Sequence, residues 1–179
     1  TDFKKALECL RPHLVDPVRA DALNALVKLL HNKQKPTNVA QVRQLSPFRY
    51  PGGKTWLVPE VRKWLMTSKR QPSVFVEPFA GGAMSGLTVA AESLAEHVVL
   101  AELDDDVAAV WQTIFAGRDA DVRWLCNRIT GFDVTLENVR KVLDGKPSST
   151  KEWAWRTIIK NRMQRGGIMA AGAGLVKTG

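Results

Sequence analysis

Two strand-like runs end in acidic residues, and a pair of glycines follows the first run. "SVFVE" ends in Glu77 and leads to Gly81 and Gly82, and "HVVLAE" ends in Glu102. Glycines at such a point let the chain turn sharply and let a ligand approach the main chain. Glu102 follows Gly81 by 21 residues, where a carboxylate can accept hydrogen bonds from both hydroxyls of a ribose. The alternative for Glu102 is a helix cap or a solvated carboxylate beside the acidic stretch 104–106.

A second glycine pair, Gly52-Gly53, stands directly before Lys54 in "FRYPGGK". These glycines allow close backbone approach, and Lys54 can supply a cation to an anionic ligand. The alternatives are a lysine exposed at a helix start and, for Tyr50, a surface aromatic. A phosphate loop G-x-x-x-x-G-K-[ST] needs glycine at the position of Phe48, so a P-loop-like NTPase is kept as an alternative only. The later turn "GGAMSG" also departs from the G-x-G-x-x-G of dinucleotide-binding oxidoreductases.

The elements expected to position these residues form a βαβ unit. The strands are expected at 73–77 and 97–102, with a helix within 81–95 between them. Parallel strands need such a crossover, and α/β folds bind their ligands beyond the carboxyl ends of the strands. The fold class expected is therefore α/β. Before this unit, a helix entered near Pro59 is predicted to bury one apolar stripe, made of Leu57, Val61, Trp64 and Leu65.

Outside the βαβ unit the sequence predicts mainly helices. One or two amphipathic helices are expected within residues 1–31, followed by a polar connector. Downstream, helical spacing recurs in three stretches, and Ser149 with Glu152 forms a possible capping box that opens a further helix. The glycine-rich residues 165–179 are expected to be a loop. The three downstream helical stretches are 104–117, 120–129 and 135–143.

The composition is that of a globular protein, with 45% hydrophobic and 25% charged residues. No apolar run has the roughly 20 residues of a membrane span, and no signal peptide opens the chain, so a cytoplasmic location is expected. Cys9 and Cys126 fit no metal-ligand or redox spacing and are interpreted as reduced thiols; no metal site is expected. The net charge of +8 is segregated, because residues 71–150 are acidic and both flanks are basic. Such flanks favour binding to a polyanion, although basic residues also merely solvate helix faces.

Three stretches resemble the adenine-N6-specific DNA methyltransferases, in the block order of their alpha class, also called D12-type. They are "SPFRYPGGK", "VFVEPFAGGAMSGL" and "VVLAELDDDVAAVWQTI", which together span residues 46 to about 115. A fainter match, "IIKNRMQRGGI" (158–168), is similar to the segment that leads into the target-recognition region of the family. The resemblance implies a Rossmann-like S-adenosylmethionine-dependent methyltransferase fold, present in part, with a helical N-terminal extension. It implies residues 1–45 as the extension, 46–150 as the cofactor-binding core and 151–179 as the start of target recognition.

The resemblance also implies a site for S-adenosylmethionine and a double-stranded DNA partner. Lys54 would lie near the methionine end of the cofactor, with Tyr50 packing against it, and Glu102 would bind the ribose. The family commonly has aspartate at that last position. The basic flank at Lys160, Arg162 and Arg165 is interpreted as DNA backbone contact, or alternatively as a solvated helix face. The cofactor residues expected are Tyr50, Gly52, Gly53, Lys54, Glu77, Pro78, Phe79, Ala80, Gly81, Gly82, Glu102 and Leu103.

The catalytic tetrapeptide of the family, D/N-P-P-Y/F, does not occur in this chain. The chain has nine prolines, and no two are adjacent. In alpha-class order the tetrapeptide would follow the target-recognition region. We therefore expect no catalytic residue here and a chain that is inactive alone, being either an N-terminal portion of a longer enzyme or half of a split enzyme. The alternative is a non-catalytic nucleic-acid-binding module with a degenerate methyltransferase fold.

Overall fold

The computed structural model describes residues 39–49, 53–167, 169 and 174–176. The helices expected within residues 1–31, and the cofactor candidates Tyr50 and Gly52, lie outside the described residues. The chain divides into two compact units, each described by itself below. Unit 1 comprises Thr1–Ser46 and Gly52–Glu102, and unit 2 comprises Pro47–Pro51 and Leu103–Gly179.

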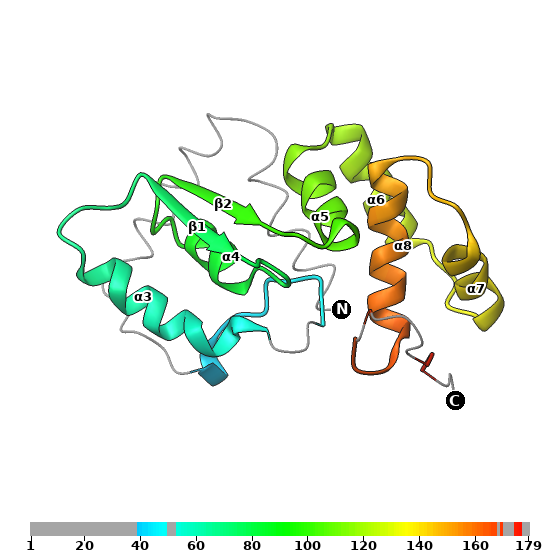
Figure 1. Ribbon diagram of the computed structural model, residues 1–179, viewed down its shortest axis with the longest axis horizontal. Coiled ribbons are helices and arrows are strands. Elements are labelled where there is room, and N and C mark those ends of the chain that lie inside the picture. Colours follow the sequence, from blue (N-terminus) through cyan, green and yellow to red (C-terminus); the bar gives the residue numbers. More distant parts are fainter. Residues whose placement is uncertain (1–38, 50–52, 168, 170–173, 177–179) are drawn as a thin grey trace. The chain divides into compact units, whose positions relative to one another are not determined.

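Unit 1 contains the expected βαβ arrangement. Strands β1 (Val74–Pro78) and β2 (His97–Ala101) pair in parallel, from Val74 opposite His97 to Pro78 opposite Ala101. Helix α4 (Met84–Ala91) makes the crossover and packs on the strands (Figure 1). Both strands therefore end at the same edge, as the sequence predicts, and the described part of the fold is mixed α/β. A Rossmann-like methyltransferase fold beyond this unit stays a prediction.

The two faces of the strand pair differ in solvent exposure. Phe75 and Glu77 on β1, with Val98 and Leu100 on β2, lie on the face that is at least half-buried. The other face carries large apolar side chains that are about half exposed, so the apolar strand at 97–102 is not buried on this face. A strand that reads as a continuous apolar run is usually covered on both sides. Among the described residues a helix, α4, covers one side. The exposed side chains are Val74, Val76 and Val99.

Helix α3 (Val58–Thr67) follows a short 3-10 turn, η3 (Lys54–Leu57), and has Pro59 in its first turn, as expected. The apolar stripe predicted for it is partly wrong. Val58, Arg62 and Leu65 are buried, whereas Trp64 is 63% exposed. Arg62 takes an inward position because its guanidinium forms an ion pair with Glu92 at the end of α4.

Unit 2 is helical and is built around α8 (Thr150–Met163). Helix α8 contacts the three helices that precede it in the chain (Figure 1). Its buried side chains lie on several sides of the helix, because neighbours cover it from more than one direction. The three helices are α5 (Asp105–Trp111), which continues into a π-helical turn, η4 (Gln112–Ala116), then α6 (Asp119–Thr130) and α7 (Leu136–Asp144).

The predicted capping box at the start of α8 is only partly formed. Ser149 is the N-cap residue, but its hydroxyl makes no cap hydrogen bond. The Glu152 carboxylate instead accepts hydrogen bonds from the backbone N–H and the hydroxyl of Ser148. These bonds favour the charged form and hold the pKa of Glu152 below its usual value. The helix therefore begins where predicted, with the preceding serine as the partner.

The residues after α8 turn back on the helix. A short 3-10 turn, η5 (Arg165–Gly167), is followed by an isolated antiparallel bridge between Gln164 and Leu175. The expected loop therefore has local structure in its described part. In unit 1, residues Val39–Gln41 form the 3-10 turn η2. Cys126 on α6 is half-buried. In the described residues no helix has the length and apolar character to cross a membrane.

Candidate cofactor site

The turn after β1 has an unusual backbone. Phe79, Gly81 and Ala83 all have positive φ, between 52° and 53°. For a residue other than glycine this conformation costs about 1–2 kcal/mol. The turn is nevertheless fixed, because Ala80 N–H donates to Ala101 O at 2.9 Å and Ala83 N–H donates to Ala80 O at 2.7 Å. Strain held in place by surrounding contacts is characteristic of ligand-binding segments.

Glu77 caps helix α4 from the neighbouring strand. The N-cap residue of α4 is Ala83, which has no side chain that could accept a hydrogen bond. The Glu77 Oε2 atom instead accepts the N–H of Gly86 in the first turn of the helix at 2.6 Å. The carboxylate, whose residue is 2% exposed, thus satisfies a donor that a helix start leaves unpaired and also meets the positive end of the helix dipole.

Lys54 crosslinks the same turn. Its Nζ lies 3.4 Å from Glu77 Oε1, an ion-pair distance, although Oε1 makes no hydrogen bond to a described residue. Nζ also donates to Phe79 O at 2.6 Å and lies 3.5 Å from Ala80 O. The ammonium thus contacts backbone oxygens of the turn and stands at ion-pair distance from Glu77 on β1. Lys54 therefore lies beside the predicted site, and in this structure its charge is balanced by Glu77.

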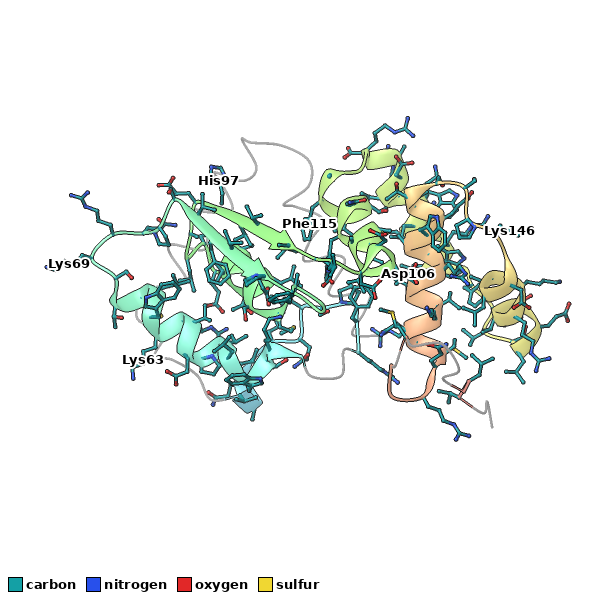
Figure 2. All side chains as sticks on the ribbon, viewed as in Figure 1. Lys63, Lys69, His97, Asp106, Phe115 and Lys146 are labelled. Carbon is teal, nitrogen blue, oxygen red and sulfur yellow. The ribbon has the colours of Figure 1, made fainter. Side chains whose placement is uncertain are left out.

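Glu102 connects the end of β2 with the glycine turn. Its Oε2 accepts the N–H of Gly81 at 2.6 Å, across 21 residues of sequence. The nearby acidic residues have other roles: Asp104 caps α5 by accepting from the N–H groups of Asp106 and Val107. Asp106 faces α8 and pairs with Lys160 at 3.3 Å (Figure 2). Among these residues, Glu102 is the one that brings a carboxylate to the predicted turn.

Two apolar side chains predicted for the site are strongly exposed. Phe79 is 79% exposed and Leu103, directly after Glu102, is 87% exposed. An exposed phenylalanine in a left-handed conformation is uncommon, and nothing in its own packing explains it. A flat apolar ring at the end of the strand can contact a planar ligand.

The three basic residues interpreted as DNA contacts have different surroundings. Lys160 is ion-paired with Asp106. Arg162 donates to Pro47 O at 2.6 Å, and burial lowers the pKa of its guanidinium. Arg165 is exposed and follows the end of α8. The structure thus brings Lys160 and Arg162 into contacts within unit 2 and leaves the Arg165 side chain facing solvent.

Two residues important to this architecture were missed in the sequence analysis. Gly86 lets α4 approach the strands, because a Cβ there would lie 2.6 Å from Leu100 Cδ2 and 2.9 Å from Glu77 Oε2. A glycine inside a helix costs about 1 kcal/mol relative to alanine and thus signals a packing reason. Asn161 is 1% exposed and holds two distant segments. It lies in the stretch 158–168 that resembles the family, but the sequence indicates neither its burial nor its partners.

The described residues provide no support for the alternative nucleotide sites. A phosphate loop joins a strand to a helix, but residues 39–49 contain no strand, and Lys54 itself contacts the β1 turn. Within the described part of the chain, no cluster of three or more His, Cys, Asp or Glu side chains could hold a metal ion.

The comparisons with known proteins agree with the resemblance in the sequence. The family model for D12 class N6 adenine-specific DNA methyltransferases matches residues 50–141. This range contains the turn after β1, Glu77, Lys54 and Glu102, and it covers half of the chain. Neither the curated proteins nor the solved structures include a significant match. By the family model, the predicted family is confirmed, and the chain belongs to the D12 class N6 adenine-specific DNA methyltransferases.

Proposed function

We propose that this chain carries the S-adenosylmethionine-binding part of a DNA methyltransferase that modifies N6 of adenine. The observation that supports this most strongly is the 2.6 Å hydrogen bond from Gly81 N–H to Glu102 Oε2. It links a glycine turn to an acidic side chain at the carboxyl ends of two adjacent parallel strands, the usual ligand position in α/β folds.

The residues around this link suit the chemistry of S-adenosylmethionine. A carboxylate has about four acceptor positions, so Glu102 can hold Gly81 and also accept hydroxyl groups of a ribose. Phe79 offers an exposed ring for the planar adenine. The cofactor, when bound, supplies a methyl group on a cationic sulfonium. It has no pyrophosphate, which agrees with the poor match to both nucleotide fingerprints.

In this proposal Lys54 mainly holds the turn after β1 in place. Its ammonium ties Phe79 O and Glu77 to one another, which keeps the strained turn in one conformation. The carboxylate of the cofactor would lie on the same side of the turn, as the family resemblance implies. The remaining predicted contacts, Gly53, Pro78, Ala80, Gly82 and Leu103, would line the site through their backbone or apolar atoms.

We further propose that these 179 residues bind the cofactor without transferring its methyl group. No D/N-P-P-Y/F tetrapeptide occurs among them, and in this family that tetrapeptide receives the target adenine outside the stacked duplex. A segment or chain carrying it would complete the enzyme. Residues 151–179 are proposed to begin the DNA-recognition region, with Arg165 as a phosphate contact.

Calorimetric titration of the chain tests the proposal. S-adenosylmethionine is expected to bind with one-to-one stoichiometry, and ATP with magnesium is expected to give no heat of binding. Incubation with radiolabelled S-adenosylmethionine and double-stranded DNA is expected to leave the DNA unlabelled. Absence of cofactor binding would favour the non-catalytic module, binding of ATP alone would favour an NTPase, and labelled adenine would contradict the proposed inactivity.

A further inference from the structure

Three cations of unit 2 gather around one tryptophan and one carboxylate. The guanidinium carbon of Arg128 and the Nζ of Lys151 lie 5.2 Å and 5.4 Å from the centroid of the Trp124 ring. The Asp121 carboxylate on α6 accepts hydrogen bonds from Lys151 Nζ at 2.8 Å and from Arg118 Nε at 3.0 Å. We refer to Arg118, Trp124, Arg128 and Lys151 together as the α6 basic surface.

The α6 basic surface is assembled by two packed helices. On α6, Asp121, Trp124 and Arg128 follow one another at intervals of three and four residues, which places them on one side of the helix. Helix α8 packs against α6 and brings Lys151, in its first turn, to the same place. Arg128 is exposed, and the side chain of Arg118 at the start of α6 is 82% exposed. A ligand in solvent can therefore reach both arginines.

Positive charge is in excess at this surface. The hydrogen bonds from Arg118 and Lys151 lower the pKa of Asp121 to about 2, so this carboxylate is charged at neutral pH. Glu152, which follows Lys151, accepts its hydrogen bonds from the serine before the N-cap of α8. Even with Glu152 counted, three cations stand against two carboxylates. Gathered like charges repel one another, and a bound anion relieves this repulsion.

Trp124 holds the Arg128 guanidinium without using its hydrogen-bond donors. The attraction acts between the positive charge and the face of the ring, so the N–H groups of Arg128 stay available. Among the described residues, none accepts a hydrogen bond from Arg128. A guanidinium presents its donors as a fork that fits two oxygens of a phosphate. Arg128 is thus a positioned cation that suits a phosphate group.

The spacing of the two exposed arginines suits a duplex. Arg118 and Arg128 are ten residues apart, which corresponds to about 15 Å along the axis of α6. The major groove of B-DNA is roughly 12 Å wide. With their long side chains, the two arginines can therefore contact phosphates on both sides of a groove.

We propose that the α6 basic surface binds the sugar–phosphate backbone of double-stranded DNA, independently of base sequence. The inference rests on the proposed function for its choice of partner, because a DNA methyltransferase must hold its duplex substrate. Contacts to phosphates orient a protein on the duplex without reading the bases. The proposal places DNA contacts on α6, upstream of residues 151–179.

Fluorescence anisotropy of a labelled DNA duplex, titrated with the chain at several salt concentrations and without cofactor, tests this proposal. Arg128→Ala is expected to weaken binding about 5- to 10-fold and to reduce the slope of log affinity against log salt by about 1. Arg128→Lys keeps the charge and should keep the slope. Trp124→Leu removes the ring that holds the cation, and it should weaken binding about 2- to 5-fold.

The matched control is Arg123→Ala, which removes the same charge from the same helix. Arg123 is five residues from Arg128 and therefore lies about 140° away around α6. There its guanidinium pairs with Asp119 at 3.8 Å, and its side chain is 61% exposed. Arg123→Ala is expected to bind DNA with nearly the affinity and salt slope of the wild type.

Equal losses of DNA affinity in Arg128→Ala and Arg123→Ala would indicate a general effect of net charge and would overturn the proposal. Unchanged binding by Arg128→Ala, or no binding by the wild type, would also overturn it. Two duplexes of unrelated sequence should lose affinity alike, and a loss confined to one of them would contradict recognition of the backbone.

The outcome is separable from that of the proposed function, because the DNA assay contains no S-adenosylmethionine. A chain that binds DNA through Arg128 but binds no cofactor would refute the proposed cofactor role and support the α6 basic surface. A chain that binds the cofactor, with DNA affinity unaffected in Arg128→Ala, would support the cofactor role and refute the surface.

Discussion

At the amino end of α4, Glu77 from β1 faces Lys54; at the carboxyl end, Glu92 faces Arg62 from α3. The Arg62–Glu92 pair joins α3 to the carboxyl end of α4, whereas the Lys54–Glu77 pair joins η3 to β1. The Arg62 guanidinium binds both oxygens of Glu92, which is the strongest geometry available to such a pair. Glu77 divides its carboxylate between Lys54 and a backbone N–H.

The backbone conformation also differs between the two ends of α4. Ser93 after α4 has φ of 51°, and this is explained by a Schellman motif. Leu94 N–H donates to Val89 O, and Ser93 N–H donates to Ala90 O. At the amino end the positive φ values of Phe79 and Ala83 follow no such helix-end pattern. The carboxyl end of α4 is thus a regular helix C-cap. The amino end follows a strained turn held by charged groups, as is common at binding sites.

The largest effect on stability is expected when the carboxylates of Glu77 and Glu92 are replaced one at a time. Glu77→Gln and Glu92→Gln should each lower the free energy of unfolding by about 1–3 kcal/mol, because each removes an ion pair that is shielded in part from solvent. Urea unfolding measures this change. Calorimetry with S-adenosylmethionine should then separate the ends, because only Glu77→Gln loosens the predicted cofactor turn. Equal loss of affinity in both variants would show that the two ends of α4 do not differ in function.

A smaller loss of stability is expected when the amino end of α4 is moved away from the strands. In Gly86→Ala the new Cβ meets Leu100 Cδ2 and Glu77 Oε2, and the overpacking should cost about 1–3 kcal/mol. The better helix propensity of alanine offsets about 1 kcal/mol of this cost. Gly174→Ala is the matched control, because a Cβ there meets no atom within 4 Å. Equal unfolding midpoints for the two variants would contradict the close packing of α4.

The local elements of unit 1 were predictable because their signals lie within short stretches of sequence. Short runs of β-branched and other apolar residues marked β1 and β2, and Glu102 was assigned to the strand end where it is found. The exposed position of Trp64 was not predictable, because Arg62 fills the inward position through its bond to Glu92, 30 residues later. Local periodicity contains no information about such a partner.

The side-chain partners that could not be predicted from the sequence are mostly long-range contacts. Lys54 was predicted as a cation for a ligand, and its contact with Glu77 depends on a tertiary arrangement that no local pattern indicates. Asn161 and Arg49 are 112 residues apart, and neither residue type nor spacing indicates that they meet. The family resemblance supplied the positions of the site residues, and the structure supplied the contacts that hold them.

The most direct test of the cofactor site is the affinity of S-adenosylmethionine for Glu102→Ala, measured by calorimetry beside Glu96→Ala. Both variants remove one carboxylate near an end of β2, but Glu96 is exposed at the start of the strand and Glu102 follows its end. Losing the ribose contacts and the bond to Gly81 should weaken binding between about 10-fold and 100-fold. Glu96→Ala should bind as the wild type does. Equal affinities for Glu102→Ala and the wild type would contradict the assignment of this turn as the cofactor site.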